Sequence, residues 1–463
     1  MRSCFHLLLL FLSIILLGLQ SAEAASPPNI ILVFMDDLGY ADIGSFGATR
    51  QETPHLDQMA TEGMRLTDFY STCSVCTPSR SSLMTGCYPR RVNMHVDEKN
   101  LCVLFPAARK GLSPDEVTIA ELLKQQGYAT ACLGKWHLGD HPDFLPNSQG
   151  FDYYFGILYS NDMNRKEVPL PLVRNETVIE VPVKQETITQ RYTEEAVRFI
   201  TTNKKRPFFL YLPHTAVHLP LFPGKSFQGK SQNGRYGDWV EEVDASMGTI
   251  FETLKSEGLD DNTLVLFTSD NGSQREGSND PLRGKKGRTD EGGMRVPCVV
   301  RWPGKIPAGS SSGEITATID LLPTFARLAG TSAPRDRIID GKDIWPILSG
   351  QPQARSPHEA FYYYQMDQLQ AVRSGPWKLF VAMDAKKRNW GKPEPAQPLK
   401  LFNLATDIHE DINLATAKPD VVKRLLVLAE KARRDLGDTG RPGVGQRKAG
   451  WVEKPAPRLQ TAD

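Results

Sequence analysis

The sequence has no excess of charge of either sign. Its 463 residues include 55 Lys plus Arg and 54 Asp plus Glu, which gives a net charge of +1. Proteins that hold nucleic acid or an anionic membrane through their overall field need a clear positive excess, so we expect neither partner. If this chain handles an anion, a few local residues must bind it.

Cysteine is also scarce. There are 7 cysteines, and four of them lie between residues 73 and 102, where one or two disulfides would be the ordinary explanation. So few cysteines in so long a chain exclude a disulfide-dense scaffold. Cys73-Ser-Val-Cys76 is the one C-x-x-C sequence, and neither a second pair nor paired histidines complete a zinc site.

A long apolar run occurs only once, from Leu7 to Leu19. Arg2 precedes it, and Ala22-Glu23-Ala24 follows as a small-x-small cleavage pattern. A membrane anchor is the alternative, but the run is short for a span and no basic cluster follows it. We therefore expect residues 1–24 to be a signal peptide of a protein that is exported to a periplasmic, secreted or lysosome-like location. We expect no stable membrane insertion.

Strand and helix patterns alternate over most of the chain, which is typical of a mostly parallel sheet covered by helices on both faces. We assign residues 25–350 to this α/β domain. The predicted strands are 28–34, 128–133, 207–211 and 263–268, and the predicted helices are 53–62, 113–127, 192–202 and 236–257.

The pattern changes after about residue 350. Four short strand candidates and one amphipathic helix, 420–436, predict a small α+β subdomain with an antiparallel sheet over residues 351–440. Residues 441–463 are rich in glycine, proline and charge, so we expect a loose tail.

Two predicted parallel strands end in polar pairs. Asp36-Asp37 follows the first strand, and Asp270-Asn271 follows the strand 263–268. Ligands of parallel sheets lie beyond the carboxyl ends of the strands, and an all-oxygen set suits Ca²⁺ or Mg²⁺ better than zinc. A helix cap or a turn would explain either pair alone, but both pairs together favour a divalent cation.

The segment Cys76-Thr77-Pro78-Ser79-Arg80, followed by Met84-Thr85-Gly86, resembles the signature of the sulfatase family. Further family blocks occur in the expected order, and the resemblance covers about residues 28 to 415, with the arylsulfatase A branch as the nearest. These blocks are Asp36-Asp37, Gly134-Lys135-Trp136-His137-Leu138-Gly139, His218 before Leu219-Pro220, Asp270-Asn271-Gly272, Leu282–Gly287 with Glu291-Gly292-Gly293, and Leu399–Ala415.

The resemblance implies a fold and a cofactor set. The fold would be alkaline-phosphatase-like, with a large mixed, mostly parallel sheet between helices and a small C-terminal α+β domain. Cys76 would be oxidised to formylglycine by a formylglycine-generating system during export. One Ca²⁺, with Mg²⁺ as the alternative, would be held by Asp36, Asp37, the modified Cys76, Asp270 and Asn271.

The resemblance also implies roles for three basic side chains and a serine hydroxyl. Arg80 would hold the hydrated aldehyde, and Lys135 and Lys286 would bind sulfate oxygens. The spacing to Glu291 favours Lys286 over its neighbour Lys285. Ser160 would donate a hydrogen bond to the sulfate.

Two histidines complete the implied set. His137 would contact the second hydroxyl of the aldehyde hydrate, and His218 would protonate the departing oxygen as general acid. His214, four residues before His218, is the rival for that role or a supporting residue.

The resulting expectation is an exported hydrolase of sulfate monoesters, either aryl sulfates or sulfated carbohydrates, with a sulfated carbohydrate as the default partner. A phosphomonoester or phosphonate hydrolase of the same superfamily is the main alternative, but such enzymes use Ser or Thr where this chain has Cys76. A non-catalytic protein that binds sulfated glycans is the remaining alternative, and it would be expected to have lost some of these residues.

Overall fold

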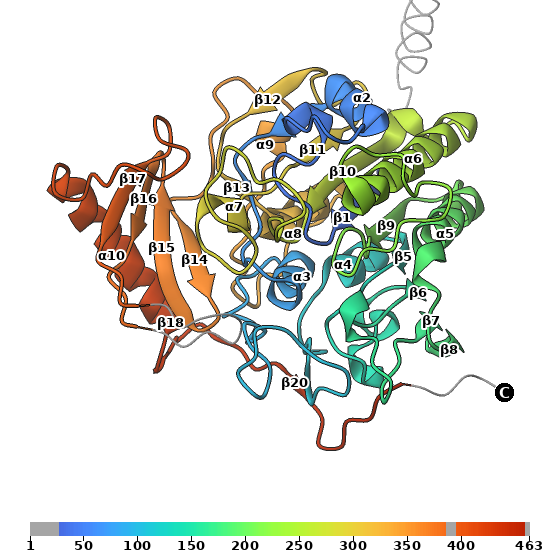
Figure 1. Cartoon of the computed structure of the whole chain (residues 1–463), viewed down its shortest axis with the longest axis horizontal. Coiled ribbons are helices and arrows are strands. Elements are labelled where there is room, and N and C mark those ends of the chain that lie inside the picture. The colour runs from blue at the N-terminus through green and yellow to red at the C-terminus, as the bar shows by residue number, and fades with distance from the viewer. Residues whose placement is uncertain (1–26, 386–394, 459–463) are drawn as a thin grey trace, which may run out of the picture.

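The computed structural model describes residues 27–385 and 395–458 (Figure 1). Its centre is a ten-stranded sheet with the order β12-β2-β11-β10-β1-β9-β5-β6-β7-β8. The five middle strands are parallel to one another. They are β10 (Thr263–Ser269), β1 (Asn29–Met35), β9 (Phe208–Pro213), β5 (Ala129–Leu133) and β6 (Tyr153–Gly156).

The outer strands are short and mixed in direction. Towards one edge, β11 and β2 run antiparallel to their inner neighbours, and β12 is parallel to β2. Towards the other edge, β7 and β8 form an antiparallel hairpin. The predicted large, mixed and mostly parallel sheet is confirmed. The bounds of these strands are Val299–Arg301 (β11), Met64–Leu66 (β2), Ser310–Ser312 (β12), Leu172–Arg174 (β7) and Thr177–Glu180 (β8).

Helices cover both faces of the sheet. Phe208 and Phe209 are neighbours on β9, so their side chains point to opposite faces. Phe208 contacts Phe199 of α5 (Ile188–Asn203), whereas Phe209 contacts Phe325 of α8 (Leu321–Leu328). A strand that is covered on both sides needs a continuous apolar run, and every residue of β1 is buried. The other long helix of the α5 side is α6 (Gly234–Ser256).

One predicted helix begins later than expected. The sequence suggested a start near Ser113, but α4 spans Ile119–Gln125. Thr118 accepts a hydrogen bond from the Glu121 N–H, and the Glu121 carboxylate accepts one from the Thr118 N–H. This reciprocal cap fixes the helix start and outweighs the proline at position 114.

A second sheet with the order β14-β15-β16-β17 lies beside the main sheet, and all its neighbouring strands are antiparallel (Figure 1). Helix α10 (Pro419–Asp435) packs on β15 and β16. These elements agree with the small α+β unit expected after residue 350. The strands are Phe361–Gln365 (β14), Gln368–Ser374 (β15), Trp377–Phe380 (β16) and Lys400–Asn403 (β17).

The end of the chain differs from the expected loose tail. Up to residue 458 it runs back along the large domain (Figure 1). β20 (Gly450–Trp451) pairs with β4 (Lys110–Gly111), and the Arg447 guanidinium lies 2.7 Å from the Glu116 carboxylate. Specific pairing partners on the large domain therefore order a segment whose composition alone suggests disorder.

A buried ionic cluster joins the second sheet to the large domain. The Lys378 ammonium lies 2.9 Å from carboxylate oxygens of both Glu291 and Glu410, and it donates to the Thr289 carbonyl at 2.8 Å. Burial raises the pKa of Glu410 to about 7. Burial acts in the same direction on Glu291, but Lys378 and two arginines lower its pKa to about 2. Through these contacts of Lys378, the second sheet holds residues 289–291, which follow Lys286 in the chain.

Several sequence expectations concern features away from the sheets. The expected signal peptide lies outside the described residues. Within residues 27–385 and 395–458, no helix is both long and apolar enough to cross a membrane. Disulfides were the ordinary explanation for the clustered cysteines, but the six described cysteines are buried free thiols.

One buried carboxyl group gives a stability prediction. Glu242 on α6 accepts a hydrogen bond from the Gly224 N–H at 2.8 Å, and burial raises its pKa from 4.5 to about 7. Because the folded-state pKa lies above the unfolded one, stability contributed by protonated Glu242 is complete below pH 4.5 and is lost as the pH rises through 7. Glu242→Gln keeps an acceptor, so we expect it to stabilise the protein by about 1–3 kcal/mol at pH 8 and little at pH 4.5.

Thermal unfolding at the two pH values measures this effect. Exposed Glu252→Gln on the same helix is the matched control and is expected to change nothing. An equal shift for Glu242→Gln at both pH values would contradict the burial argument.

Candidate active site

The carboxyl ends of the five middle strands converge on one site. Register places Met35 of β1 beside Ser269 of β10, so Asp36-Asp37 and Asp270-Asn271 leave the sheet side by side. β9 is followed by the segment that holds His214 and His218, β5 by Lys135 and His137, and β6 by Ser160. The topology therefore explains why residues from distant parts of the sequence meet.

Gly134 lets the chain turn tightly at the end of β5. Its φ is +144°, and a Cβ atom there would lie 1.9 Å from the Pro213 carbonyl oxygen. The next amide, of Lys135, donates to that same carbonyl at 2.8 Å. A larger residue at position 134 would displace β5 from β9 and move Lys135 out of the site.

Cys76 is the first residue of α3 (Cys76–Thr85). Its Sγ lies 3.4 Å from Asp36 Oδ1. Burial and the Asp36 carboxylate raise the pKa of the thiol well above its usual value, so the unmodified residue is a neutral thiol. The positive end of the helix dipole nevertheless favours an anion at this position.

Asp36 lies among positive groups. Lys135 Nζ is 2.5 Å and Arg80 Nη2 is 3.7 Å from its carboxylate, and all three side chains are fully buried. Burial alone would raise the pKa of Asp36, but Lys135, His218, Arg80 and Lys286 together hold it well below its usual value. Asp36 is therefore an anion and can serve as a cation ligand.

Lys286, and not Lys285, reaches this cluster. Its ammonium lies 2.8 Å from the Asp37 carboxylate, and the pKa of Lys286 is raised because Asp37 and neighbouring groups outweigh the effect of burial. Lys285 instead lines a cavity on the other side of the same loop. Of the two neighbouring lysines, Lys286 therefore lies with the clustered carboxylates and Lys285 does not.

Asp270 and Asn271 meet the same carboxylates. Asp270 accepts from the Asp37 N–H at 3.2 Å and pairs with Arg80 at 2.9 Å. Burial and the nearby Asp36 raise the pKa of Asp270 to about 7. The Asn271 amide nitrogen donates to Asp37 at 2.7 Å, which leaves its Oδ1 buried without a hydrogen-bond partner within the described residues. A buried carbonyl oxygen beside three carboxylates fits a divalent cation.

Potential ligand atoms of Asp36, Asp37, Cys76 and His218 all lie within 4.8 Å of one another. Three of these four residues belong to the predicted ligand set. The fourth, His218, was expected to act as an acid and not as a ligand. With Asp270 and the Asn271 Oδ1 beside them, oxygen atoms are the majority of the potential ligands, which suits calcium or magnesium better than zinc.

His137 has one ring nitrogen free for the substrate. Its Nε2 lies 3.0 Å from the Leu104 carbonyl oxygen, which can only accept, so Nε2 carries the proton. Nδ1 is buried and has no hydrogen-bond partner among the described residues. Burial and Lys135 lower the pKa of His137 well below its usual value. A neutral ring whose Nδ1 accepts a hydrogen bond suits contact with a hydroxyl group.

In His218 the other ring nitrogen, Nδ1, carries the proton. Its Nδ1 lies 2.9 Å from Asn161 Oδ1 and 2.6 Å from the Leu219 carbonyl oxygen. A carbonyl oxygen can only accept. The Asn161 amide nitrogen is used elsewhere, because it donates to the His218 and Pro220 carbonyl oxygens, so the Asn161 atom that faces the ring is also an acceptor. Nδ1 therefore carries a proton, and Nε2 faces Asp37 at 3.6 Å. Burial and Lys286 lower the pKa of His218, while Asp37 acts to raise it.

Ser160 is brought to the site between two of these groups. Its Oγ lies 3.2 Å from Lys135 Nζ and 3.4 Å from His218 Nδ1. The neighbouring Asn161 was missed by the sequence reasoning, although it orients His218. The only signal was its position next to Ser160.

His214 is buried deeper and away from the charges. Neither of its ring nitrogens has a hydrogen-bond partner in the described part of the chain, and its ring packs edge-on against Tyr192. Burial lowers its pKa to about 3. A neutral histidine of this kind is a poorer proton donor than His218.

Comparisons with known proteins agree with this geometry. A family model described as Sulfatase matches residues 28–331. Models described as N-sulphoglucosamine sulphohydrolase, C-terminal, and as C-terminal region of aryl-sulfatase match residues 286–387 and 356–452.

Individual proteins show the same similarity. Human arylsulfatase A is 38% identical over 477 residues, which cover 92% of this chain and 92% of the relative. N-acetylgalactosamine-6-sulfatase of Canis lupus familiaris is 40% identical over 383 residues, which cover 78% and 73%. The crystal structure of Ps i-CgsB in complex with k-i-k-neocarrahexaose has a TM-score of 0.75 at 33% identity and covers 88% of this chain and 92% of that one.

These matches span both sheets, and the predicted alkaline-phosphatase-like fold is confirmed. The chain therefore belongs to the sulfatase family and is a sulfuric ester hydrolase.

Proposed function

We propose that this protein is an exported sulfatase that removes sulfate from carbohydrate esters through a formylglycine at position 76 and one divalent cation. The observation that carries the proposal is the meeting of Cys76, two lysines, Arg80 and His218 around the paired aspartates at the sheet edge. A single sulfate group is small enough to contact all of them.

The chain's own residues would divide the work as follows. Lys135 and Lys286 exchange their carboxylate partners for sulfate oxygens, where fixed cations stabilise developing charge. Ser160 donates a hydrogen bond to the sulfate, and Arg80 holds residue 76 in place. His137 accepts a hydrogen bond from residue 76 through Nδ1.

Two groups of the proposed site are not standard side chains: formylglycine, which would be made from Cys76, and a divalent cation. Hydrated formylglycine at position 76 would supply two hydroxyls on one carbon, one as a nucleophile toward sulfur and one whose proton loss would allow sulfate to leave. The cation would be held by Asp36, Asp37, Asp270, Asn271 and residue 76, and it would neutralise charge on the sulfate.

A carbohydrate ester is the substrate that the relatives favour. One relative is named for N-acetylgalactosamine-6-sulfate, and the Ps i-CgsB crystal contains a neocarrahexaose. The apolar leader at residues 1–24 supports export, where such polysaccharides occur. The test is sulfate release by purified enzyme from a panel of sulfated sugars and from 4-nitrophenyl sulfate, with 4-nitrophenyl phosphate beside it. A preference for the phosphate ester would favour the phosphatase alternative and refute the proposal.

We expect His218 to be the general acid. Proton donation matters most for a poor leaving group, so His218→Ala is expected to slow hydrolysis of a sulfated sugar by about 10²–10⁴-fold and that of an activated aryl sulfate much less. The structural reason is that Nδ1 is held by the Asn161 and Leu219 oxygens, so Nε2, which faces Asp37 at 3.6 Å, is the nitrogen that would take up a second proton and donate it. The measurement is kcat/KM on both substrates.

His214→Ala is the matched control. It is expected to lose less activity and to lose it equally on both substrates, because its ring contacts none of the charged groups. Equal losses for His218→Ala on both substrates would point to sulfate binding. A leaving-group-dependent loss for His214→Ala would move the acid role to that residue.

A further inference from the structure

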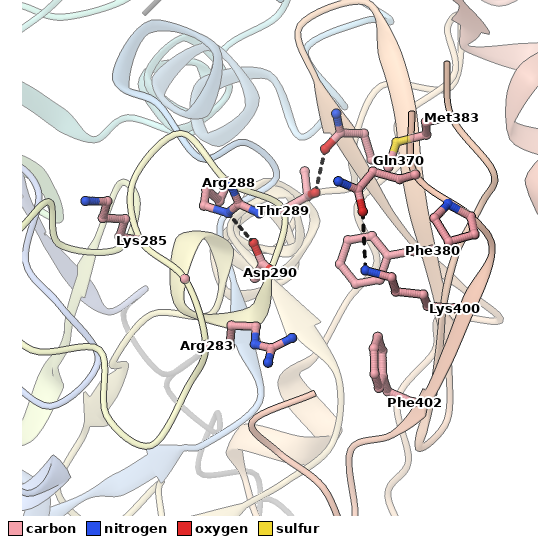
Figure 2. Close-up of a pocket in the computed structure, with 13 residues that line it drawn as sticks. Arg283, Lys285, Arg288, Thr289, Asp290, Gln370, Phe380, Met383, Lys400 and Phe402 are labelled. Atoms are coloured by element: carbon pink, nitrogen blue, oxygen red, sulfur yellow. Dashed lines mark hydrogen bonds and ion pairs between the residues drawn. The ribbon is translucent and has the colours of Figure 1, made fainter. Parts of the chain in front are cut away.

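A second polar cavity lies on the far side of the loop that carries Lys286. It has a volume of about 530 Å³ and lies between residues 283–290 and the second sheet. Figure 2 shows the two walls: Arg283 and Asp290 on the loop, and Phe380, Lys400 and Phe402 on the strands. No role proposed above uses this cavity.

Positive charge dominates the lining. Four basic residues and one acid, Asp290, line it, but Asp290 is paired with Arg288 at 2.6 Å. The Lys285 ammonium points away, so the excess positive charge comes from Arg283 and Lys400. Arg283 and Lys400 point into the space between the walls, whereas Lys285 turns away from it (Figure 2). A cavity of this charge would take an anion.

Arg283 and Lys400 can both be recruited by a ligand. Arg283 pairs at 2.9 Å with Asp411, but their side chains are 41% and 57% exposed, so water screens this pair. The Lys400 ammonium donates to the amide oxygen of Gln397 at 3.2 Å, which is a neutral partner. Replacing these contacts with an anionic ligand would cost little.

The sheet wall also offers an apolar surface. The rings of Phe380 and Phe402 lie edge to face with their centroids 6.1 Å apart. Sugars have apolar C–H faces between their hydroxyls, and aromatic rings are suitable surfaces for them. Cations on one side and aromatic rings on the other suit a sugar that carries a charge better than a free inorganic ion.

The cavity is close to the proposed sulfate site along the chain. Arg283 and Lys286 are three residues apart, so their Cα atoms are at most about 11 Å apart. Thr289, which follows in the same loop, donates to Gln370 of β15 at 2.7 Å and fixes the loop against the sheet. The loop thus presents Lys286 to one space and Arg283 to the next.

We infer that this cavity binds a second anionic sugar of the same substrate chain, so that the enzyme prefers multiply sulfated oligosaccharides to isolated sulfated sugars. This inference rests on the proposed function, which supplies the first sulfated sugar. Arg283 and Lys400 bind the sulfate or carboxylate of the second sugar, and the partly exposed ring of Phe380 packs against its ring.

Equilibrium binding tests the inference without turnover. The Cys76→Ala protein is titrated with a panel of multiply sulfated tetrasaccharides, and with the singly sulfated and desulfated forms of each. We expect a multiply sulfated member to bind tightest, and adding Lys400→Ala or Arg283→Ala to weaken it about three- to tenfold. Binding of the singly sulfated form should not change. Lys431→Ala, at an exposed position of α10, is the matched control.

Kinetics of the otherwise wild-type enzyme separate the two proposals. Lys400→Ala is expected to raise KM for the multiply sulfated tetrasaccharide and to leave kcat/KM for 4-nitrophenyl sulfate unchanged. Any of three results would overturn the inference. The Cys76→Ala protein could bind all forms equally, it could bind no member of the panel, or Lys400→Ala could affect every ligand equally. Failure of the wild-type enzyme to release sulfate from any ester would instead refute the proposed function, while the binding result would still decide the role of the cavity.

Discussion

Replacing Cys76 with alanine is expected to abolish sulfate ester hydrolysis and to leave the thermal midpoint nearly unchanged. Alanine cannot be converted to an aldehyde, so the proposed nucleophile would be absent. The fold should tolerate the change because alanine favours helices and Cys76 is the first residue of α3. The measurement is hydrolysis of 4-nitrophenyl sulfate together with a thermal unfolding curve.

Cys73→Ala is the matched control. Cys73 is a buried free thiol in the same segment, and it begins the same C-x-x-C sequence. We expect this variant to keep most of its activity. A Cys76→Ala enzyme with even a tenth of wild-type activity would refute the assignment of the nucleophile.

Removal of a divalent cation is expected to reduce sulfate ester hydrolysis by a similarly large factor. Three carboxylates of the site contact Arg80, Lys135 and Lys286, and the two lysines pair with Asp36 and Asp37. A bound cation would take over those carboxylates and release the lysines for sulfate. We therefore expect a chelator to reduce activity at least a hundredfold, in the range of losing a main electrostatic group. Added Ca²⁺ or Mg²⁺ should restore it.

Elemental analysis of the purified protein checks the stoichiometry. We expect one calcium or magnesium per chain, lost in Asp270→Ala and retained in Asp280→Asn, which changes an exposed acid on the same loop. Two metals per chain, or zinc alone, would contradict the single-cation account and favour the phosphatase alternative.

The sequence predicted the strand ends well because parallel strands are buried on both faces. The run from Asn29 to Met35 is apolar at nearly every position, so the acids that follow it mark where the strand leaves the core. The same reasoning located Asp270 after β10, whereas Lys135, which follows β5, was identified by the family block around it. Register between neighbouring strands then brought these residues together without any further signal.

Features that depend on partners distant in sequence could not be predicted. The start of α4 is an exception, because the Thr118–Glu121 cap is local and was missed in favour of an equally plausible start at Pro114. The buried Lys378 pairs with Glu291, 87 positions away in the sequence, and with Glu410, 32 positions away. In the sequence, Lys378 looks like any surface lysine of an antiparallel strand.

The tail illustrates the same limit. Its composition indicates disorder, yet Arg447 finds Glu116 and β20 finds β4 on the large domain. Composition indicates how much apolar surface a segment can bury by itself. It does not show which surface of the folded protein will lie next to that segment.

The mass of the peptide that spans residue 76 shows directly whether Cys76 is converted to formylglycine. The protein is expressed in a host with a formylglycine-generating system, digested and analysed by mass spectrometry. The account predicts a peptide lighter than the cysteine form by the difference between a thiol and an aldehyde side chain, in an amount that rises with the specific activity. Fully active enzyme whose residue 76 remains an unmodified cysteine would contradict it.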